Sequence, residues 1–330
     1  MLLKKIGLVF ILFYLVGSSG CKNDMSITAQ NYQESVIQKP ELTKLPFAFS
    51  GRTKMENTPV IFNSRLLLVA NYRPSGPTSP EDKNSFLYVE DLKTGKEISR
   101  FGMAHSFVSA IVDGDELNVF ALDFSNSGEV WKSNGINHFV TNDLENWSEK
   151  KVILPEGDEL LFNTSVCRDD KGFLMAYESN QPVKFCFKFA RSNDLSKWEK
   201  IPGLVYTGEH DEYSACPVIR YFNPYYYIIY LHAPIEGHNG WTSYLARSKD
   251  LHNWELCPFN PVLEAEGGEG DNNSDVDIIE YEGKTYLYYA TGDQATWATL
   301  RVALFDGSLK EFFESHFPDK MEFIKVSAEH

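Results

Sequence analysis

Basic residues are scarce in this sequence. Its 330 residues include 31 lysines and arginines against 46 aspartates and glutamates, which gives a net charge of −15 at pH 7. Nucleic acids and anionic lipid surfaces attract positively charged proteins, so this balance argues against either one as a partner. The acidity does not identify a substrate, because exported proteins are also acidic for solubility.

Cysteine is scarce too, with five in the chain and none in a CxxC pair or in a Cys/His cluster with zinc spacing. Cys167 and Cys216 fall inside apolar strand patterns. Such positions favour small buried thiols over a disulfide, although an exported chain could form one. We predict no metal site built from these residues.

The N-terminus has the features of an export signal. Lys4 and Lys5 precede an apolar run over residues 6–16, which is too short for an ordinary membrane-spanning helix. The run leads into Cys21 through a stretch that resembles a bacterial lipobox. We predict a lipoprotein signal peptide over 1–20, lipidation of Cys21 and a polar tether over 21–44; simple secretory cleavage is the alternative. The predicted location is the outer membrane, on the periplasmic or the outer surface, and the mature net charge would be −17.

A spaced repeat indicates the architecture. The pattern Asp-Leu, two residues and then Trp occurs three times, beginning at Asp143, Asp194 and Asp250, which are 51 and 56 residues apart. A period of roughly 40–60 residues built from short strands is typical of β-propeller blades. We interpret Trp147, Trp198 and Trp254 as structural, with each Asp capping a turn and each ring packing between blades.

The spacing of strand and turn signals sets the blade count. Alternating or aromatic runs lie at 65–71, 86–90, 116–122, 173–178, 225–232 and 285–291, separated by short turn sequences, with no convincing amphipathic helix. Residues 214–221 align without a gap on 274–281, which sets Ala215 against Asp275, and similar units begin near residues 59, 105 and 163. We predict an all-β, five-bladed β-propeller over 45–318, followed by a tail over 319–330.

These motifs resemble those of a known group of enzymes. The repeated SxDLxxWE, the Ala215-Cys216-Pro217 segment and the sequence of residues 272–294 are similar to the five-bladed propeller glycosidases, which include glycoside hydrolase families 43, 32, 68 and 117. The resemblance covers about residues 50–318 and implies acidic side chains at the starts of the inner strands, facing the axial channel. Hydrolysis of a glycoside needs two carboxyl groups, one to donate a proton and one to attack or to activate water.

The sequence departs from that group at two positions. The invertase-like branch has Glu-Cys-Pro where this protein has Ala215-Cys216-Pro217, so that acid is absent. Family 43 has an Asp just before Pro at the first inner strand, where this protein has Glu56-Asn57-Thr58-Pro59. Either catalysis has been lost and sugar binding kept, or neighbouring acids serve instead.

Several residues at the starts of the inner strands are candidates for the chemistry. Asp275 and Asp277 share one face of a strand, and two carboxylates would not be packed dry without partners, so we expect them to face the channel. A turn-capping role for Asp275 is the alternative. The remaining catalytic candidates are His210, Asp211 and Glu212, for which a solvated loop is the alternative, and Glu178. Glu178 ends an apolar strand and suits either a proton donor with a raised pKa or a structural partner of an arginine.

Substrate contacts are predicted from polar and aromatic residues near the same strand starts and in adjoining loops. The candidates are His105, Asn163, Asn273, His238, Trp241 and Trp297. The amide of Asn163 would suit hydroxyl recognition and the indole rings would suit stacking on a sugar, whereas surface exposure or blade packing would explain the histidines and tryptophans otherwise. No cofactor is predicted; residues 270–275 are rich in oxygen ligands but lack EF-hand spacing, so an axial calcium ion is not assigned.

Three functions remain compatible with the sequence. The preferred one is a glycoside hydrolase that acts on a plant or algal oligosaccharide or polysaccharide by carboxylate acid/base chemistry at the mouth of the propeller. The first alternative is a propeller that binds glycans without cleaving them, which Ala215 favours. The second is a scaffold for partner proteins in the cell envelope. Fold alone does not decide among them.

Overall fold

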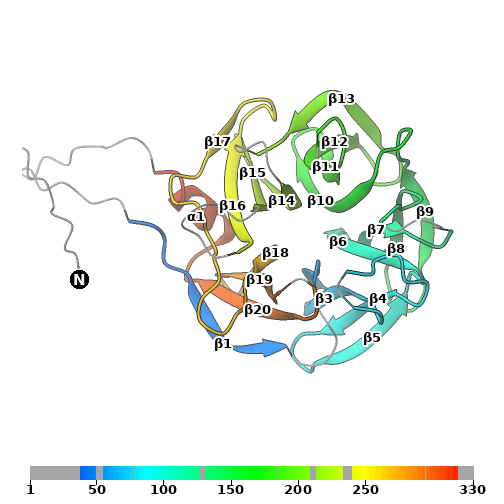
Figure 1. Cartoon of the computed structure of the whole chain (residues 1–330), viewed down its shortest axis with the longest axis horizontal. Coiled ribbons are helices and arrows are strands. Elements are labelled where there is room, and N and C mark those ends of the chain that lie inside the picture. The colour runs from blue at the N-terminus through cyan, green and yellow to red at the C-terminus, as the bar shows by residue number, and fades with distance from the viewer. Residues whose placement is uncertain are drawn as a thin grey trace, which may run out of the picture. The chain divides into compact units, whose positions relative to one another are not determined.

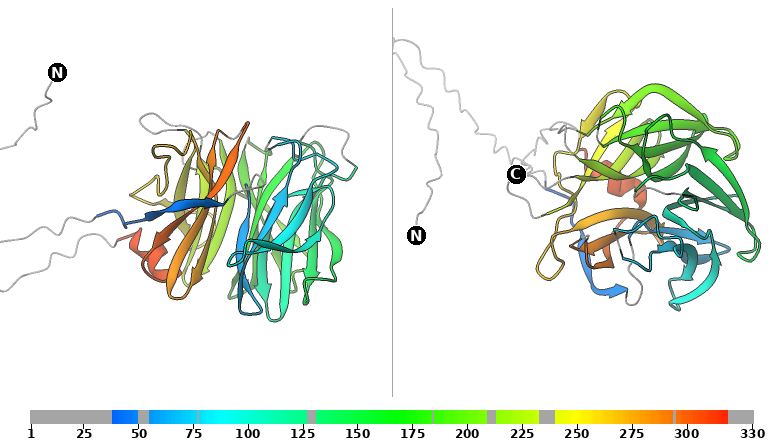
Figure 2. Two further views of the ribbon diagram at one scale, coloured as in Figure 1. Left: turned by 90° about the horizontal axis from the view of Figure 1, so that it is seen from below. Right: turned by 45° about the vertical axis from the view of Figure 1, so that its right-hand side comes forward.

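The fold is a five-bladed β-propeller, as the sequence predicts (Figure 1). The structure is a computed structural model that describes residues 38–49, 55–76, 78–126, 131–183, 185–208, 213–232, 240–293 and 295–318. Five four-stranded antiparallel sheets surround a central axis, and residues 37–319 form one compact unit. The side view in Figure 2 shows the strands of the blades running along this axis from one face of the ring to the other. None of the described residues forms a helix long and apolar enough to cross a membrane.

Each blade has four strands, ordered from the axis outward. The innermost strands are β2 (Thr58–Phe62), β6 (His105–Asp113), β10 (Leu161–Asp169), β14 (Ser214–Phe222) and β18 (Asn273–Tyr281). The second strands are β3 (Arg65–Tyr72), β7 (Glu116–Asp123), β11 (Gly172–Ser179), β15 (Tyr225–His232) and β19 (Lys284–Gly292). The third strands are β4 (Phe86–Asp91), β8 (Ile136–Thr141), β12 (Cys186–Ser192), β16 (Thr242–Ser248) and β20 (Ala298–Phe305). The outermost strands are β5 (Lys96–Phe101), β9 (Ser148–Ile153), β13 (Glu199–Tyr206), β17 (Trp254–Leu256) and β1 (Thr43–Phe49).

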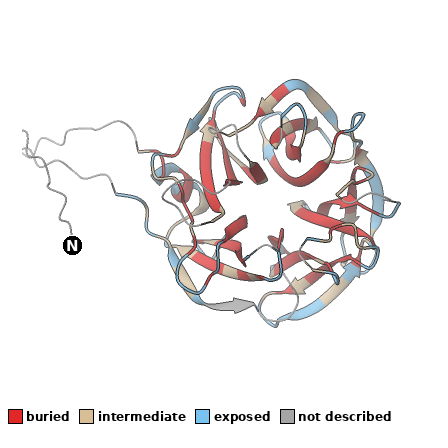
Figure 3. Cartoon of the chain, in the orientation of Figure 1, coloured by how far each residue is buried: buried red, intermediate tan, exposed pale blue. Residues whose placement is uncertain are grey.

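The hydrophobic core lies between adjacent blades. Both faces of the second strands are covered by neighbouring sheets, so nearly every residue of β7, β11 and β15 is buried (Figure 3). Two-residue turns join the first and second strands of each blade, which the Asp113↔Glu116 and Tyr281↔Lys284 pairs illustrate. The predicted turn sequences are therefore confirmed as hairpins.

Strand β1 closes the ring. It pairs with β20, so the N-terminal strand is the outermost strand of the fifth blade, which otherwise comes from the C-terminal part of the sequence. The strand begins at Thr43, two residues before the predicted start of the propeller. Lys44 Nζ lies 2.6 Å from Glu269 Oε2 and 2.9 Å from Asn273 Oδ1, which ties β1 to the loop before β18.

The Asp-Leu-x-x-Trp repeat is structural, as predicted. The Asp143 carboxylate accepts hydrogen bonds of 2.8 Å from the backbone N–H groups of Glu145 and Asn146, while Leu144 has a positive φ of 67°. The Trp147 ring stacks on Phe101 of the preceding blade, with centroids 3.6 Å apart. The two other copies repeat this arrangement, because Trp198 contacts Phe120 and Trp254 contacts Tyr206, each in the preceding blade. The repeat thus joins neighbouring blades.

The gapless alignment of the fourth and fifth blades is wrong by one residue. Strands β14 and β18 end at Phe222 and Tyr281, each of which closes a two-residue hairpin. Counting back from these ends sets Cys216, and not Ala215, against Asp275. Ala215 pairs with Leu231, is fully buried and lines neither of the axial spaces described below.

One helix departs from the prediction that the domain has none. Helix α1 (Leu309–Ser315) begins with a capping box, in which the side chains of Ser308 and Glu311 each bond the other's backbone N–H. It is anchored by Phe312 and Phe313, which are fully buried beside the fourth and fifth blades. Seven residues give too little periodicity for detection from sequence. The four described cysteines are free thiols; Cys167 is buried, as predicted, whereas Cys216 is only partly buried.

Candidate active site

One residue from each blade forms a ring at the axis. In each blade, this residue lies six positions before the end of the innermost strand. Its side chain lines a cavity at the axis. These five ring residues are Glu56, Phe107, Asn163, Cys216 and Asp275. In the second to fifth blades the pairing register shifts at this point, and such β-bulges re-aim side chains next to active sites.

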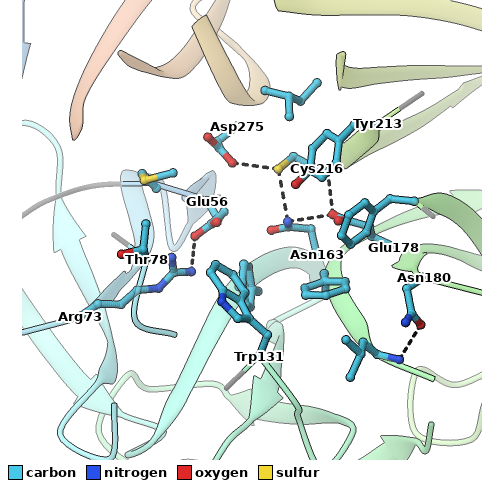
Figure 4. Close-up of a pocket in the computed structure, with 16 residues that line it drawn as sticks. Glu56, Arg73, Thr78, Trp131, Asn163, Glu178, Asn180, Tyr213, Cys216 and Asp275 are labelled. Atoms are coloured by element: carbon cyan, nitrogen blue, oxygen red, sulfur yellow. Dashed lines mark hydrogen bonds and ion pairs between the residues drawn. The ribbon is translucent and has the colours of Figure 1, made fainter. Parts of the chain in front are cut away.

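The cavity above this ring has a volume of about 610 Å³ and is lined by residues of all five blades. Such a volume lies within the range of small-molecule sites, about 300–1,000 Å³. Figure 4 shows Glu56 and Arg73 on one side and Glu178 with Tyr213 on the other, while Asp275 and Cys216 lie between them. Three carboxyl groups, those of Glu56, Glu178 and Asp275, therefore share one concave site.

Glu178 is held by groups from two blades. Its side chain comes from β11 and is 1% exposed. Its Oε2 accepts hydrogen bonds of 3.0 Å from Asn163 Nδ2 and 3.0 Å from the backbone N–H of Cys216. Burial raises the pKa of Glu178 to about 7, and the charge of Asp275 adds to the effect, although the hydrogen bonds oppose it. A carboxyl with this pKa can hold a proton near neutral pH.

Asp275 is buried beside two donors that stabilise its ionised form. Its Oδ1 accepts a hydrogen bond of 2.8 Å from the Cys216 thiol, and its Oδ2 accepts one from the Ser274 hydroxyl. Burial raises the pKa of Asp275, whereas these hydrogen bonds and the charge of Arg73 lower it. Burial and the neighbouring carboxyl groups raise the pKa of Cys216 well above its usual value. Cys216 is therefore a neutral hydrogen-bond donor to Asp275.

Glu56 forms an ion pair inside the cavity. The Arg73 guanidinium, 5% exposed, donates a hydrogen bond to Glu56 Oε2 and lies 4.5 Å over the Phe107 ring. Burial raises the pKa of Glu56 to about 8 against the effect of Arg73, and Asp275 and Glu178 add repulsion. The three carboxyl groups thus interact electrostatically and titrate as a coupled set.

Asp277 lies one layer deeper in the channel. It lines a small axial space of about 20 Å³ below the ring and does not line the main cavity. Its carboxylate is paired with Arg220, whose Nη2 also donates to the Ile278 carbonyl at 3.0 Å. Asp277 faces the channel, as predicted, but its charge is already neutralised by Arg220.

The other predicted site residues have different surroundings. His105 is buried, with Nδ1 at 2.9 Å from the Met103 carbonyl and Nε2 at 3.0 Å from Asn137, and it does not line the cavity. Asn273 is fully buried against Lys44 and Glu269 and does not line it either.

Two predicted tryptophans lie outside the lining as well. The Trp241 ring packs against Tyr213, a lining residue, with centroids 5.0 Å apart. Trp297 is 41% exposed and is not a lining residue. The four remaining candidates, His210, Asp211, Glu212 and His238, lie outside the described residues. Among the described residues, no group of three His, Cys, Asp or Glu side chains is placed to hold a metal ion.

Sequence reasoning missed Glu56, Arg73 and Cys216 as cavity residues. Glu56 lies in the stretch that matches the family's first-blade Asp, where the comparison with the family points to a missing Asp and not to the Glu itself. Counting six residues back from the last residue before each two-residue turn would have identified Glu56, Cys216 and Asp275 together. Arg73 has no such signal, because its position depends on the fold.

Comparisons with known proteins support the fold assignment. No family model and no curated protein matches the sequence. Among solved structures, a complex of BT0996 with RGII aligns with a TM-score of 0.62 at 14% identity, covering 81% of this protein and 92% of that one. A glycosyl hydrolase from Bacteroides ovatus aligns with a TM-score of 0.58 at 12% identity, covering 83% of this protein and 92% of that one.

The Bombyx mori GH32 beta-fructofuranosidase BmSUC1 aligns with a TM-score of 0.55 at 13% identity, covering 79% of this protein and 61% of that one. At these identities the likeness is one of fold. The predicted resemblance to five-bladed propeller glycoside hydrolases is confirmed at that level, and the protein shares their architecture.

Proposed function

We propose that this protein is a glycoside hydrolase with its active site in the axial cavity. The observation that carries the proposal is the convergence of Glu56, Glu178 and Asp275, from three different blades, on one cavity of about 610 Å³. Paired carboxyl groups in a pocket are what glycoside hydrolysis requires. The preferred substrate is a plant or algal oligosaccharide.

Each carboxyl group has surroundings that suit a different role. Glu178, with a pKa of about 7, is the proton donor to the leaving oxygen. Asp275, stabilised as an anion by the Cys216 thiol and the Ser274 hydroxyl, attacks the anomeric carbon or activates water. Glu56, held by Arg73 beside the two other carboxyl groups, is the third acid and influences their protonation through the coupled set. Asn163 positions Glu178 through the 3.0 Å hydrogen bond.

Substitution of the proposed acids tests this function. A panel of plant and algal oligosaccharides is incubated with the purified protein, and released sugars are measured. Asp275→Asn and Glu178→Gln are expected to lower kcat/KM by about 10²–10⁴-fold. Asp271→Asn is the matched control, because Asp271 is an exposed residue just before β18, four positions from Asp275, and does not line the cavity. Full turnover by Asp275→Asn would remove Asp275 from the chemistry.

A glycan-binding protein without catalysis is the second candidate. It is favoured by Asn163 and Cys216, which give the third and fourth ring positions no carboxyl group. Binding of a polysaccharide without any released product, across the whole panel, would decide for this candidate.

We also propose that the protein is a lipoprotein of the outer membrane, anchored through Cys21. The support is the sequence of residues 1–21, which lie outside the described residues. Expression of the full chain with radiolabelled palmitate, followed by membrane fractionation, tests it. Wild-type protein should be labelled and sediment with membranes, and Cys21→Ser should be unlabelled; labelling of both would contradict the assignment.

A further inference from the structure

One side of the cavity is aromatic. Five lining rings from the second, third and fourth blades form a continuous surface, which we call the aromatic wall: Phe107, Trp131, Phe162, Phe185 and Tyr213. Ring centroids are 6.2 Å apart for Phe107 and Trp131 and 6.3 Å for Trp131 and Phe162. The series of contacts continues through Phe162 and Phe185 at 5.2 Å to Phe185 and Tyr213 at 4.6 Å.

Two of these aromatic residues have a left-handed backbone, a conformation that Phe107 shares with Glu56, Cys216 and Asp275 at the axis. Phe107 has a φ of 59° and Trp131 a φ of 66°, in the left-handed region that bulky residues rarely adopt. Strain of this kind persists where the surrounding structure enforces it and is concentrated at ligand clamps. Phe107 is also the aromatic member of the five residues around the propeller axis. The aromatic wall therefore reaches the level of the carboxyl groups.

The aromatic wall is larger than a sugar needs. A sugar ring presents hydroxyl groups around its edge and one small apolar face, which a single aromatic side chain covers. Glu56, Arg73 and Asp275, which lie across the cavity from Tyr213 in Figure 4, offer the charged and polar groups that hydroxyls require. Arg73 lies over the Phe107 ring at the edge of the aromatic wall. The cavity thus has a polar side and an aromatic side, in direct contact with each other.

We propose that the substrates are aryl glycosides, with the sugar among the carboxyl groups and an aromatic aglycone against the aromatic wall. This inference rests on the proposed hydrolase function and narrows its substrates to plant or algal glycosides that carry a phenolic aglycone. In the reaction, the bond between the anomeric carbon and the phenolic oxygen breaks. Glu178 gives its proton to that oxygen, and water supplies the hydroxyl group of the released sugar and returns a proton to the carboxyl set. The products are a free sugar and a phenol.

A phenolic leaving group also agrees with the acids present at the propeller axis. Phenols ionise with a pKa near 10, far below that of sugar hydroxyls, so they need less protonic assistance on departure. The fourth ring position, next to the missing acid of Glu-Cys-Pro, is the thiol Cys216, whose pKa lies well above its usual value. Glu178 is then sufficient as the one proton donor.

Binding of matched thioglycosides tests the aromatic subsite independently of turnover. Phenyl and methyl 1-thioglycosides of glucose, galactose, xylose, arabinose, fucose and rhamnose resist hydrolysis and are titrated calorimetrically into the full mature protein. For at least one sugar, the phenyl compound should bind about tenfold more tightly than the methyl compound, because ring stacking adds to area burial. Trp131→Ala and Phe185→Ala should each abolish most of this preference.

Trp297→Ala is the matched control, because Trp297 is exposed and lies outside the cavity lining; it should keep the full preference. Equal binding of phenyl and methyl compounds, no binding of any phenyl compound at millimolar concentration, or a preference that survives in both wall variants would overturn the inference. Release of sugar from oligosaccharides with no aryl preference would leave the hydrolase standing without the aromatic subsite. Tight phenyl binding without cleavage of the phenyl O-glycosides would leave the subsite standing without the hydrolase.

Discussion

Replacement of Glu178 by glutamine tests whether burial raises the pKa of this carboxyl group and makes the stability of the protein depend on pH. Burial raises the pKa of Glu178 from the ordinary 4.5 to about 7. A carboxyl group whose pKa is higher in the folded than in the unfolded state binds its proton more tightly when folded. The stability that this proton contributes is fully present below pH 4.5 and is lost as the pH rises through 7. Between pH 5 and pH 8 the loss amounts to about 2–3 kcal/mol.

Glutamine has the shape of the protonated acid and stays neutral, and its amide oxygen can accept the bonds from Asn163 and the Cys216 backbone. From pH 5 to pH 8, the free energy of unfolding of the wild type should therefore fall by about 2–3 kcal/mol relative to Glu178→Gln. Urea denaturation at a series of pH values, followed by tryptophan fluorescence, measures this difference. Parallel pH profiles of the two proteins would refute the reasoning.

Glu159→Gln, in the same blade, provides a control of opposite sign. Burial disfavours the charge of Glu159, but the Lys188 ammonium at 2.7 Å and the Ser179 hydroxyl at 2.7 Å keep its pKa below the usual value. Such a carboxylate stabilises the fold above its unfolded pKa and loses that effect as the pH falls through the folded pKa. Glu159→Gln should therefore be less stable than the wild type at pH 8.

Two further substitutions address the packing and closure of the propeller. Trp147→Ala removes the ring that stacks on Phe101 and should lower the free energy of unfolding by about 2–4 kcal/mol in urea denaturation; a loss of less than about 1 kcal/mol would show that the repeat does not join the blades. Lys44→Met leaves Glu269, 4% exposed at its side chain, without its nearest cation and should cost about 3 kcal/mol. The double variant with Glu269→Gln should recover part of that loss in the same assay, and no recovery would contradict the ion-pair explanation.

The sequence was sufficient for the number and order of blades because both depend on local patterns. Two-residue turns and the Asp-Leu-x-x-Trp segments are short-range features, and they recur at intervals that the sequence itself displays. Helix α1 escaped detection because seven residues span only about two turns.

The register at the axis was harder to predict, for a physical reason. Most residues of β14 and β18 are buried or half-buried, so the pattern of polar and apolar residues does not distinguish one alignment from the next. Both strands carry the same β-bulge at the same place, and the structural equivalent of Ser214 is Asn273. Matching Ser214 to Ser274 by residue type therefore shifts the alignment by one position. Glu178 could be singled out because a carboxyl group at the end of an apolar strand must have partners. Its partners Asn163 and Cys216 come from two other strands, and no local pattern relates them.

The pairing of β1 with β20 also has consequences for how the protein folds. Thr43 lies opposite Leu304, so the outermost strand of the fifth blade is synthesised before the other described strands and its partner after them. Contacts between residues so distant in sequence slow folding, because the entropy of closing the intervening loop must be lost before they form. During synthesis the first four blades can pair from neighbouring segments, while β1 has no partner until β20 emerges. Once β20 has formed, and until β1 pairs with it, β20 offers an open sheet edge, the kind of edge at which strands of different molecules pair and aggregate.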